Sequence, residues 1–304
     1  MSPVSEPVDL SCTPTRELLD FHQIFTYFSF MILVGTNGFQ YRDWVPVFYP
    51  RNLDPRLWLK HYALHFGCCE LSMTYYRIPE VSVIHQLTEE SGGILQFIFR
   101  VPFRLLEEHA DNAELARKFV AALDPLREAG QLAGVVAQFS PEFSFIRDNF
   151  QRLCQLRDSL GGIQLVAEFG CPDWLTLRAA KHMAAQRISL ACVDGGMSLL
   201  EKTFYSATAD LAYVRFQGRN QSRWIKGDGS AQHDYLYSKA ELAAAVIEIR
   251  RLEQVSERVL VLMNNPWRGQ ATLNARMLRE LLREENRMTN DEVRMTNEIL
   301  AERD

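Results

Sequence analysis

Polar and charged side chains stand at or near the ends of seven short apolar runs in this 304-residue chain. They are Glu70, Arg100, Gln138, Glu168, Asp194, Arg215 together with Gln217, and Asn264. Carboxylates can transfer protons or orient cations, arginines can hold phosphate or carboxylate groups, and amides can donate or accept hydrogen bonds. These residue types are suited to binding an anion, or to acid–base chemistry on it, if the chain brings them together.

The pattern between these residues predicts how they could meet. Short β-branched and apolar runs alternate with longer segments of helical period. The expected strands are 31–35, 68–71, 94–101, 132–139, 163–169, 188–194, 211–217 and 258–264. The expected helices are 55–66, 80–91, 111–129, 143–160, 172–186, 238–256 and 272–283. Eight such units favour an α/β fold of the (β/α)8 TIM-like barrel type, with an open doubly wound sheet as the alternative.

Alternation within the expected strands indicates which side chains face the lumen of such a barrel. In residues 211–217 one face carries Tyr213, Arg215 and Gln217, and the other carries alanine, valine and phenylalanine. The same alternation places Arg100 and Glu168 on the lumen side, and ligand sites of this fold lie at the carboxyl ends of the strands. We therefore expect the polar strand ends to meet at one mouth. The alternative is that these groups only satisfy one another, since buried charges must be paired.

Three carboxylates, Glu70, Glu168 and Asp194, are the candidate catalytic groups. A pair of them could act as a glycosidase does, although the neighbouring strand ends carry an amide and an arginine. No histidine falls at a strand end, so no histidine-based metal site is expected and no cofactor is identified. An all-oxygen Mg²⁺ site made by the three carboxylates stays open.

A loop rich in basic residues and glycines follows the seventh expected strand, over residues 218–229. It contains Arg219 and Arg223, while Asn264 and Asn265 supply amides at the end of the next strand. Barrel phosphate sites commonly form from the loops after strands seven and eight. The loop could therefore hold a phosphate, a carboxylate or a nucleic-acid backbone, and the alternative is a solvated loop.

Aromatic residues crowd the loop after the first expected strand, where Tyr41 and Trp44 stand, and Tyr75 follows the second strand. Such rings could stack on a base or a sugar of a ligand. The alternative is that they pack the top of the barrel.

The net charge of −5 belongs to the two ends of the chain. Residues 1–30 carry −3 and residues 284–304 carry −4, so the segment between them is close to neutral. A near-neutral barrel gives no general field for nucleic acid, and only a local basic patch could hold it. No apolar run approaches the roughly 18 residues of a membrane-spanning helix. Six cysteines without a CxxC pair, and no signal-peptide pattern, favour a cytoplasmic protein with free thiols.

Three segments are expected along the chain. Residues 1–30 form an N-terminal extension outside the fold, because they show no clear period. Residues 31–283 form the single barrel domain. Residues 284–304 form a charged helical or disordered tail, in which the tetrapeptide Arg-Met-Thr-Asn occurs at 287–290 and again at 294–297.

The order of several short motifs over residues 31–283 resembles the domain of unknown function 72 family, also called YecE-like. The motifs include Gly35-Thr36-Asn37-Gly38-Phe39, Arg100-Val101-Pro102, Gln138-Phe139-Ser140-Pro141, Ala167-Glu168-Phe169, and Asp210-Leu211-Ala212-Tyr213-Val214-Arg215 followed by Gly218-Arg219. The resemblance implies a barrel related to TIM barrels, and it supplies no established activity. Two departures from the family pattern are Gly170 in place of an arginine and Gln217 in place of a histidine. They imply a member that keeps the fold and a binding site without a histidine for proton transfer.

The leading hypothesis is a protein that binds a small or polymeric anionic ligand at the carboxyl-end mouth. Arg100, Arg215 and Arg219 would hold the negative charge. The second hypothesis is a phosphoester or nucleic-acid hydrolase, with or without a metal ion, in which a carboxylate is the general base. The third is a non-catalytic interaction protein that works through its acidic ends. The sequence leaves open whether the chain is an enzyme, and it predicts no oligomeric state.

Overall fold

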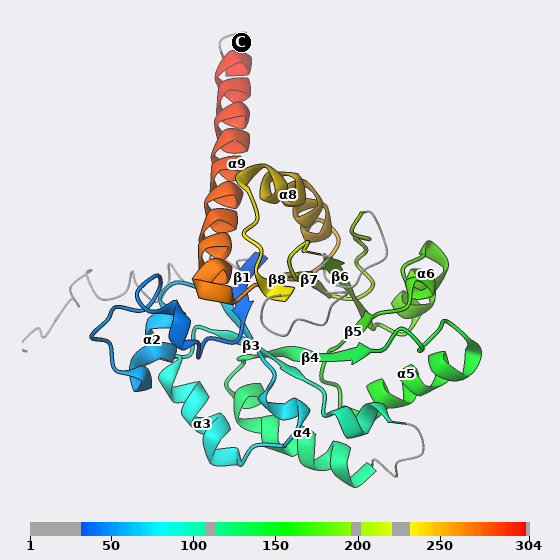
Figure 1. The fold of residues 1–304 in the computed structure, drawn as a ribbon. Helices are drawn as coiled ribbons and strands as arrows, with labels where there is room; N and C mark the ends of the chain where they lie inside the picture. Colours follow the sequence, from blue (N-terminus) through cyan, green and yellow to red (C-terminus); the bar gives the residue numbers. More distant parts are fainter. Residues whose placement is uncertain (1–31, 108–112, 196–201, 221–231, 302–304) are drawn as a thin grey trace, which may run out of the picture. The chain divides into compact units, whose positions relative to one another are not determined.

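Eight parallel strands form a closed barrel in the computed structural model, which describes residues 32–107, 113–195, 202–220 and 232–301, with side chains up to 285 (Figure 1). Each strand pairs with its neighbours in sequence, and β8 pairs with β1. The strands are β1 (Ile32–Asn37), β2 (Cys68–Leu71), β3 (Gln96–Arg100), β4 (Leu132–Phe139), β5 (Leu165–Phe169), β6 (Ser189–Asp194), β7 (Leu211–Phe216) and β8 (Arg258–Met263). The predicted (β/α)8 barrel is confirmed, and the open sheet is excluded.

Helices connect most of the strands and lie outside the barrel (Figure 1). They are α2 (Trp58–Ala63), α3 (Val81–Glu90), α4 (Ala113–Glu128), α5 (Arg147–Ser159), α6 (Leu177–Ala185), α8 (Lys239–Glu253) and α9 (Gln270–Ala301). Expected starts at Pro55 and Pro172 are short 3-10 turns that precede α2 and α6. At α8, Ser238 and Glu241 form a capping box that satisfies the first backbone amides of the helix.

The side chains of the strands pack in two layers, as the alternation predicts. Those facing the helices, such as Phe97 and Phe99, belong to the larger apolar core between strands and helices. Those facing inward, such as Ile98, Tyr213 and Leu260, fill the lumen of the barrel. The lumen is therefore packed with side chains, as is usual for this fold, in which ligands bind at the carboxyl-end mouth.

Two pairs of strands approach so closely that only glycine fits. A Cβ at Gly35 of β1 would lie 1.7 Å from the carbonyl oxygen of Cys68 in β2. A Cβ at Gly195, just after β6, would lie 2.1 Å from the carbonyl oxygen of Gly218, just after β7. Gly195 and Gly218 also have positive φ angles, of 80° and 86°, which glycine adopts without strain.

The two ends of the chain bear on the predicted domain boundaries. Helix α9 runs from Gln270 to Ala301 and so continues past the expected boundary at 283. Near that boundary Lys239 of α8 lies 3.5 Å from Glu284 of α9. Residues 1–31 lie outside the described residues, so the N-terminal extension stays a prediction. Within the described part of the chain, no helix is both long and apolar enough to span a membrane.

Candidate functional site at the mouth of the barrel

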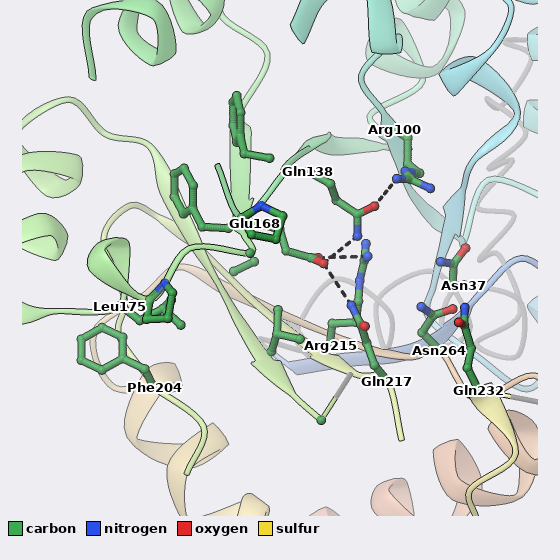
Figure 2. Close-up of a pocket in the computed structure, with 18 of the residues that line it drawn as sticks. Asn37, Arg100, Gln138, Glu168, Leu175, Phe204, Arg215, Gln217, Gln232 and Asn264 are labelled. Atoms are coloured by element: carbon green, nitrogen blue, oxygen red, sulfur yellow. Dashed lines mark hydrogen bonds and ion pairs between the residues drawn. The ribbon is translucent and has the colours of Figure 1, made fainter. Parts of the chain in front are cut away.

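A cavity of about 380 Å³ lies at the carboxyl ends of the strands (Figure 2). Its polar lining consists of Asn37, Arg100, Gln138, Glu168, Arg215, Gln217, Gln232, His233 and Asn264. Most of these residues end a strand or directly follow one, on β1, β3, β4, β5, β7 and β8. Six of the residues predicted from strand ends thus meet in one cavity: Arg100, Gln138, Glu168, Arg215, Gln217 and Asn264.

A buried ion-pair network, which we call the floor cluster, consists of Glu70, Glu168, Tyr213 and Arg215. The guanidinium of Arg215 donates to a carboxylate oxygen of Glu70 at 2.5 Å and lies 2.9 Å from a carboxylate oxygen of Glu168. The same guanidinium donates through Nε to the Tyr213 hydroxyl at 2.8 Å, and that hydroxyl donates to Glu70. The Arg215 side chain is 1% exposed and the Glu70 side chain is completely buried. Each charge therefore needs the other as its counter-ion, because an unpaired buried charge destabilises the fold.

The charges of the floor cluster shift one another's pKa. Burial alone would lower the pKa of Arg215, but the neighbouring Glu168 and Glu70 carboxylates raise it above its ordinary value. Burial raises the pKa of the Tyr213 hydroxyl, which therefore stays a hydrogen-bond donor. The arginine is consequently a fixed cation between two carboxylates, with little positive charge left for a ligand.

Glu168 is the carboxylate of this cluster that reaches the cavity. Its Oε1 accepts hydrogen bonds from the side-chain amides of Gln138 at 2.6 Å and Gln217 at 3.0 Å (Figure 2). Burial raises the pKa of Glu168, and the Arg215 guanidinium opposes that rise without cancelling it. A buried carboxyl with a raised pKa can take up or release a proton under milder conditions than a solvated one.

Arg100 is the cation at the upper edge of the cavity. Its guanidinium lies 4.3 Å from the ring centre of Tyr75 and donates to the side-chain oxygen of Gln138. Among the described residues no carboxylate lies within ion-pair distance of Arg100, although the residue is only partly buried. Arg100 therefore lines the cavity without a described carboxylate in contact with it, although its charge helps to lower the pKa of Glu168 in the same cavity.

A second network, the rim cluster, consists of Asp194, Arg219, Tyr237 and Glu241, and it lies outside the cavity. Arg219 donates to Asp194 at 2.7 and 2.9 Å and to Glu241 at 3.1 Å. The prediction that Asp194 and Arg219 face the mouth cavity is wrong for a simple reason. Val193 lines the cavity, and the next residue of a strand points to the opposite face, so Asp194 faces the helix layer.

The aromatic residues predicted to stack on a ligand also lie outside the lining of the mouth cavity. Trp44 is completely buried, stacks on Tyr49 at 6.1 Å and donates through Nε1 to the carbonyl oxygen of Pro266. Tyr41 stacks on Trp44 at 4.8 Å and lines a separate cavity beside α3. Tyr75 lines a neighbouring cavity and lies beneath Arg100. None of these three rings lines the mouth cavity, and Trp44 packs within the core.

Two other predicted ligand groups have different positions. Asn265 is buried and donates to the Tyr235 carbonyl oxygen and to Asn274, because it faces away from the cavity that Asn264 lines. Arg223 lies outside the described residues, as does most of the basic loop. The loop's phosphate-holding role therefore stays a prediction.

Several cavity residues are missing from the sequence-based set. Asn37 ends β1, which ends two residues later than expected, and the polar pair after the apolar run could have indicated it. Gln232 and His233 reach the cavity from the connection between β7 and α8. Burial lowers the pKa of His233, although its place near the backbone of Asn264 and Gln217 partly offsets this. A residue within a long connection has no periodic signal that would place it.

The three candidate carboxylates do not form a metal site in the part of the chain that the structure describes. Glu70 and Glu168 share Arg215, and Asp194 is paired with Arg219. Among these described residues no three His, Cys, Asp or Glu side chains are close enough to hold a metal ion. The open prediction of an Mg²⁺ site therefore gains no support from the carboxylates proposed for it.

The closed barrel with a polar cavity at the carboxyl ends of its strands defines a TIM-like (β/α)8 protein. A family model described as "Protein of unknown function DUF72" matches residues 33–298. The chain belongs to this family, as its motifs predict.

Relatives of known structure or sequence agree with this assignment. The chain is 26% identical over 276 residues to the UPF0759 protein YunF of Bacillus subtilis, covering 83% of this chain and 95% of that protein. A crystal structure of a DUF72 family protein from Thermotoga maritima has a TM-score of 0.75 and 32% identity, covering 83% of this chain and 99% of that one. Another, from Enterococcus faecalis, has a TM-score of 0.73 and 23% identity, covering 83% and 96%; this second likeness concerns the fold alone.

Proposed function

We propose that this protein binds a small anionic ligand, bearing a phosphate or a carboxylate, in the cavity at the mouth of the barrel. The observation that carries the proposal is the position of Arg100. Arg215 and Arg219 each contact two carboxylates, whereas no described carboxylate contacts Arg100. A guanidinium directed at a cavity, with no counter-ion in contact, suits an anionic group of a ligand.

The surroundings of Arg100 support an anion that is held by several donors. Gln138 and Asn264 line the same cavity and carry amide groups that can donate to ligand oxygens. Glu168 at the bottom carries a raised pKa, so its neutral form could donate a hydrogen bond to the same ligand. The leading hypothesis is thus refined, because one arginine rather than three provides the positive charge.

Calorimetric titration with inorganic phosphate and with acetate tests the proposal. We expect binding to the full chain that weakens by about tenfold or more in Arg100→Gln, since a charge-assisted hydrogen bond is lost. Arg178→Gln is the matched control, because Arg178 is an exposed arginine on α6 that does not line the cavity. Equal affinity of the wild type and Arg100→Gln would refute the role of Arg100. The proposal would be refuted if neither of these anions nor an organic phosphate bound to the full chain.

A second candidate function is hydrolysis of a phosphoester, including that of a nucleic acid. The raised pKa of Glu168 within the cavity favours it, because perturbed carboxyls are suited to acid–base catalysis. The expected result is turnover of p-nitrophenyl phosphate or a short oligonucleotide that is lost in Glu168→Gln. Assays with and without Mg²⁺ show whether a metal ion takes part. Turnover that survives in Glu168→Gln would exclude Glu168 as the proton-transfer group.

A further inference from the structure

The mouth cavity has two chemically different sides. Figure 2 shows Leu175 and Phe204 on one side of Glu168, and Asn37, Gln232 and Asn264 on the other. The cavity lining also includes the apolar residues Phe169, Pro172 and Val193. Glu168 and its two glutamine partners thus lie between an apolar wall and a wall of amides and Arg100.

The apolar wall is held in place by the core behind it. Leu175 follows the 3-10 turn Pro172–Trp174, and its backbone amide donates to the Pro172 carbonyl oxygen at 2.8 Å. Trp174 is completely buried, stacks on Phe169 at 4.0 Å and donates to the Phe143 carbonyl oxygen at 2.7 Å. The wall therefore does not depend on a ligand for its position.

Phe204 is anchored in a similar way by its neighbours in sequence. The hydroxyl of Thr203 donates to Asp194 at 2.9 Å, and the amide of Ser206 donates to the Cys192 sulfur at 3.4 Å. Leu175 and Phe204 both pack on the core with one side and remain partly exposed. The exposed remainder of the two side chains belongs to the lining of the cavity.

The size of the cavity adds a second constraint. A volume of about 380 Å³ falls in the range of sites for small organic molecules. An inorganic phosphate at Arg100 would fill only a small part of that space and would leave the apolar wall in contact with water. Covering this wall with an apolar group of the ligand is favourable, because apolar surface is removed from water.

We infer that the ligand is an amphiphilic acid, in which an alkyl or aryl body is attached to a phosphate or carboxylate head. The head lies at Arg100 and the amides, and the body lies against Leu175 and Phe204. This inference rests on the proposed function, since it presupposes an anionic head in the same cavity.

Calorimetry with inorganic phosphate, phenyl phosphate and hexyl phosphate on the full chain tests the inference. We expect the dissociation constants of the two organic phosphates to be lower than that of inorganic phosphate by a factor of about ten or more, because their apolar groups are buried. Leu175→Ser and Phe204→Ser should each remove most of that gain, and so lower the affinity for the two organic phosphates much more than the affinity for inorganic phosphate. Leu177→Ser is the matched control, because Leu177 is 72% exposed and does not line the cavity.

The outcomes separate the two proposals. If inorganic phosphate and the organic phosphates bind equally, the amphiphilic ligand is refuted and anion binding stands. If none of the three phosphates and no acetate binds, anion binding itself is refuted. Should the serine variants fail to fold, Leu175→Phe replaces them, because it narrows the apolar side. It should weaken phenyl phosphate more than inorganic phosphate, and an equal effect on both would refute the inference.

Discussion

The floor cluster and the rim cluster use nearly the same groups in different surroundings. Each has an arginine of β7 or the residues after it, held between two carboxylates and beside a tyrosine. The Arg215 side chain is 1% exposed, whereas the Arg219 side chain is 44% exposed. Because a buried charge that loses its partner costs far more than a solvated one, we expect the Arg215 ion pairs to contribute more to the stability of the fold than those of Arg219.

The largest effect is expected when the floor cluster loses its cation. Arg215→Met leaves Glu70 and Glu168 buried without a counter-ion, which should lower the free energy of unfolding by about 3–5 kcal/mol. Urea unfolding followed by circular dichroism measures it. A loss below about 1 kcal/mol would mean that the two carboxylates are already neutral. The floor cluster would then contribute no more to the free energy of unfolding than the rim cluster.

A smaller effect is expected at Asp194, which is the buried member of the rim cluster. Asp194→Asn keeps the shape of the side chain but removes the charge that Arg219 and the Tyr237 hydroxyl contact. We expect a loss of about 2 kcal/mol, because a hydrogen bond to a charged group is weakened and a partly buried guanidinium loses a partner. The same urea experiment measures the loss, and a value equal to that of Arg215→Met would refute the ranking by burial.

Arg219→Gln should have a smaller effect still on the free energy of unfolding. Nearly half of the Arg219 side chain is in solvent, so its ion pairs are screened and contribute about 1 kcal/mol or less. The difference from wild type should shrink further in 1 M salt, where the screening length is only about 3 Å. A difference that is insensitive to salt would show that packing of the side chain, rather than charge, accounts for it.

The smallest effect is expected on how the free energy of unfolding changes with pH, and it concerns Glu168. The pKa of Glu168 in the folded chain is raised above its ordinary value of 4.5, so the folded state holds this proton more tightly than the unfolded state. The resulting stability is complete below pH 4.5 and is lost as the pH rises through the raised pKa. Glu168→Gln lacks this proton, so wild type should lose stability relative to the variant as pH rises above 4.5. Parallel stability curves for wild type and Glu168→Gln would contradict the raised pKa.

The sequence predicts the barrel well because its strands carry a regular signal. The alternation in residues 211–217 correctly places Tyr213 and Arg215 in the lumen, and the apolar runs predict all eight strands to within a few residues. Asp194 differs from the prediction because the alternation along β6 puts Val193, and not Asp194, on the lumen side. Trp44 shows another limit, since an aromatic loop residue has the same pattern whether it packs inward or faces a ligand. His233 shows a third limit, because the long connection between β7 and α8 has no hydrophobic periodicity from which the position of a side chain could be predicted.

The stacking of Arg100 on Tyr75 has a consequence for how tightly the cavity can hold an anion. An arginine side chain loses about 2 kcal/mol of rotamer entropy when it is immobilised. Because the tyrosine ring and the Gln138 amide already restrain the guanidinium, much of that entropy is lost when the chain folds rather than when a ligand arrives. Tyr75, which lies outside the cavity lining, thus preorganises the site, and its influence on affinity comes through the freedom it removes from its neighbour.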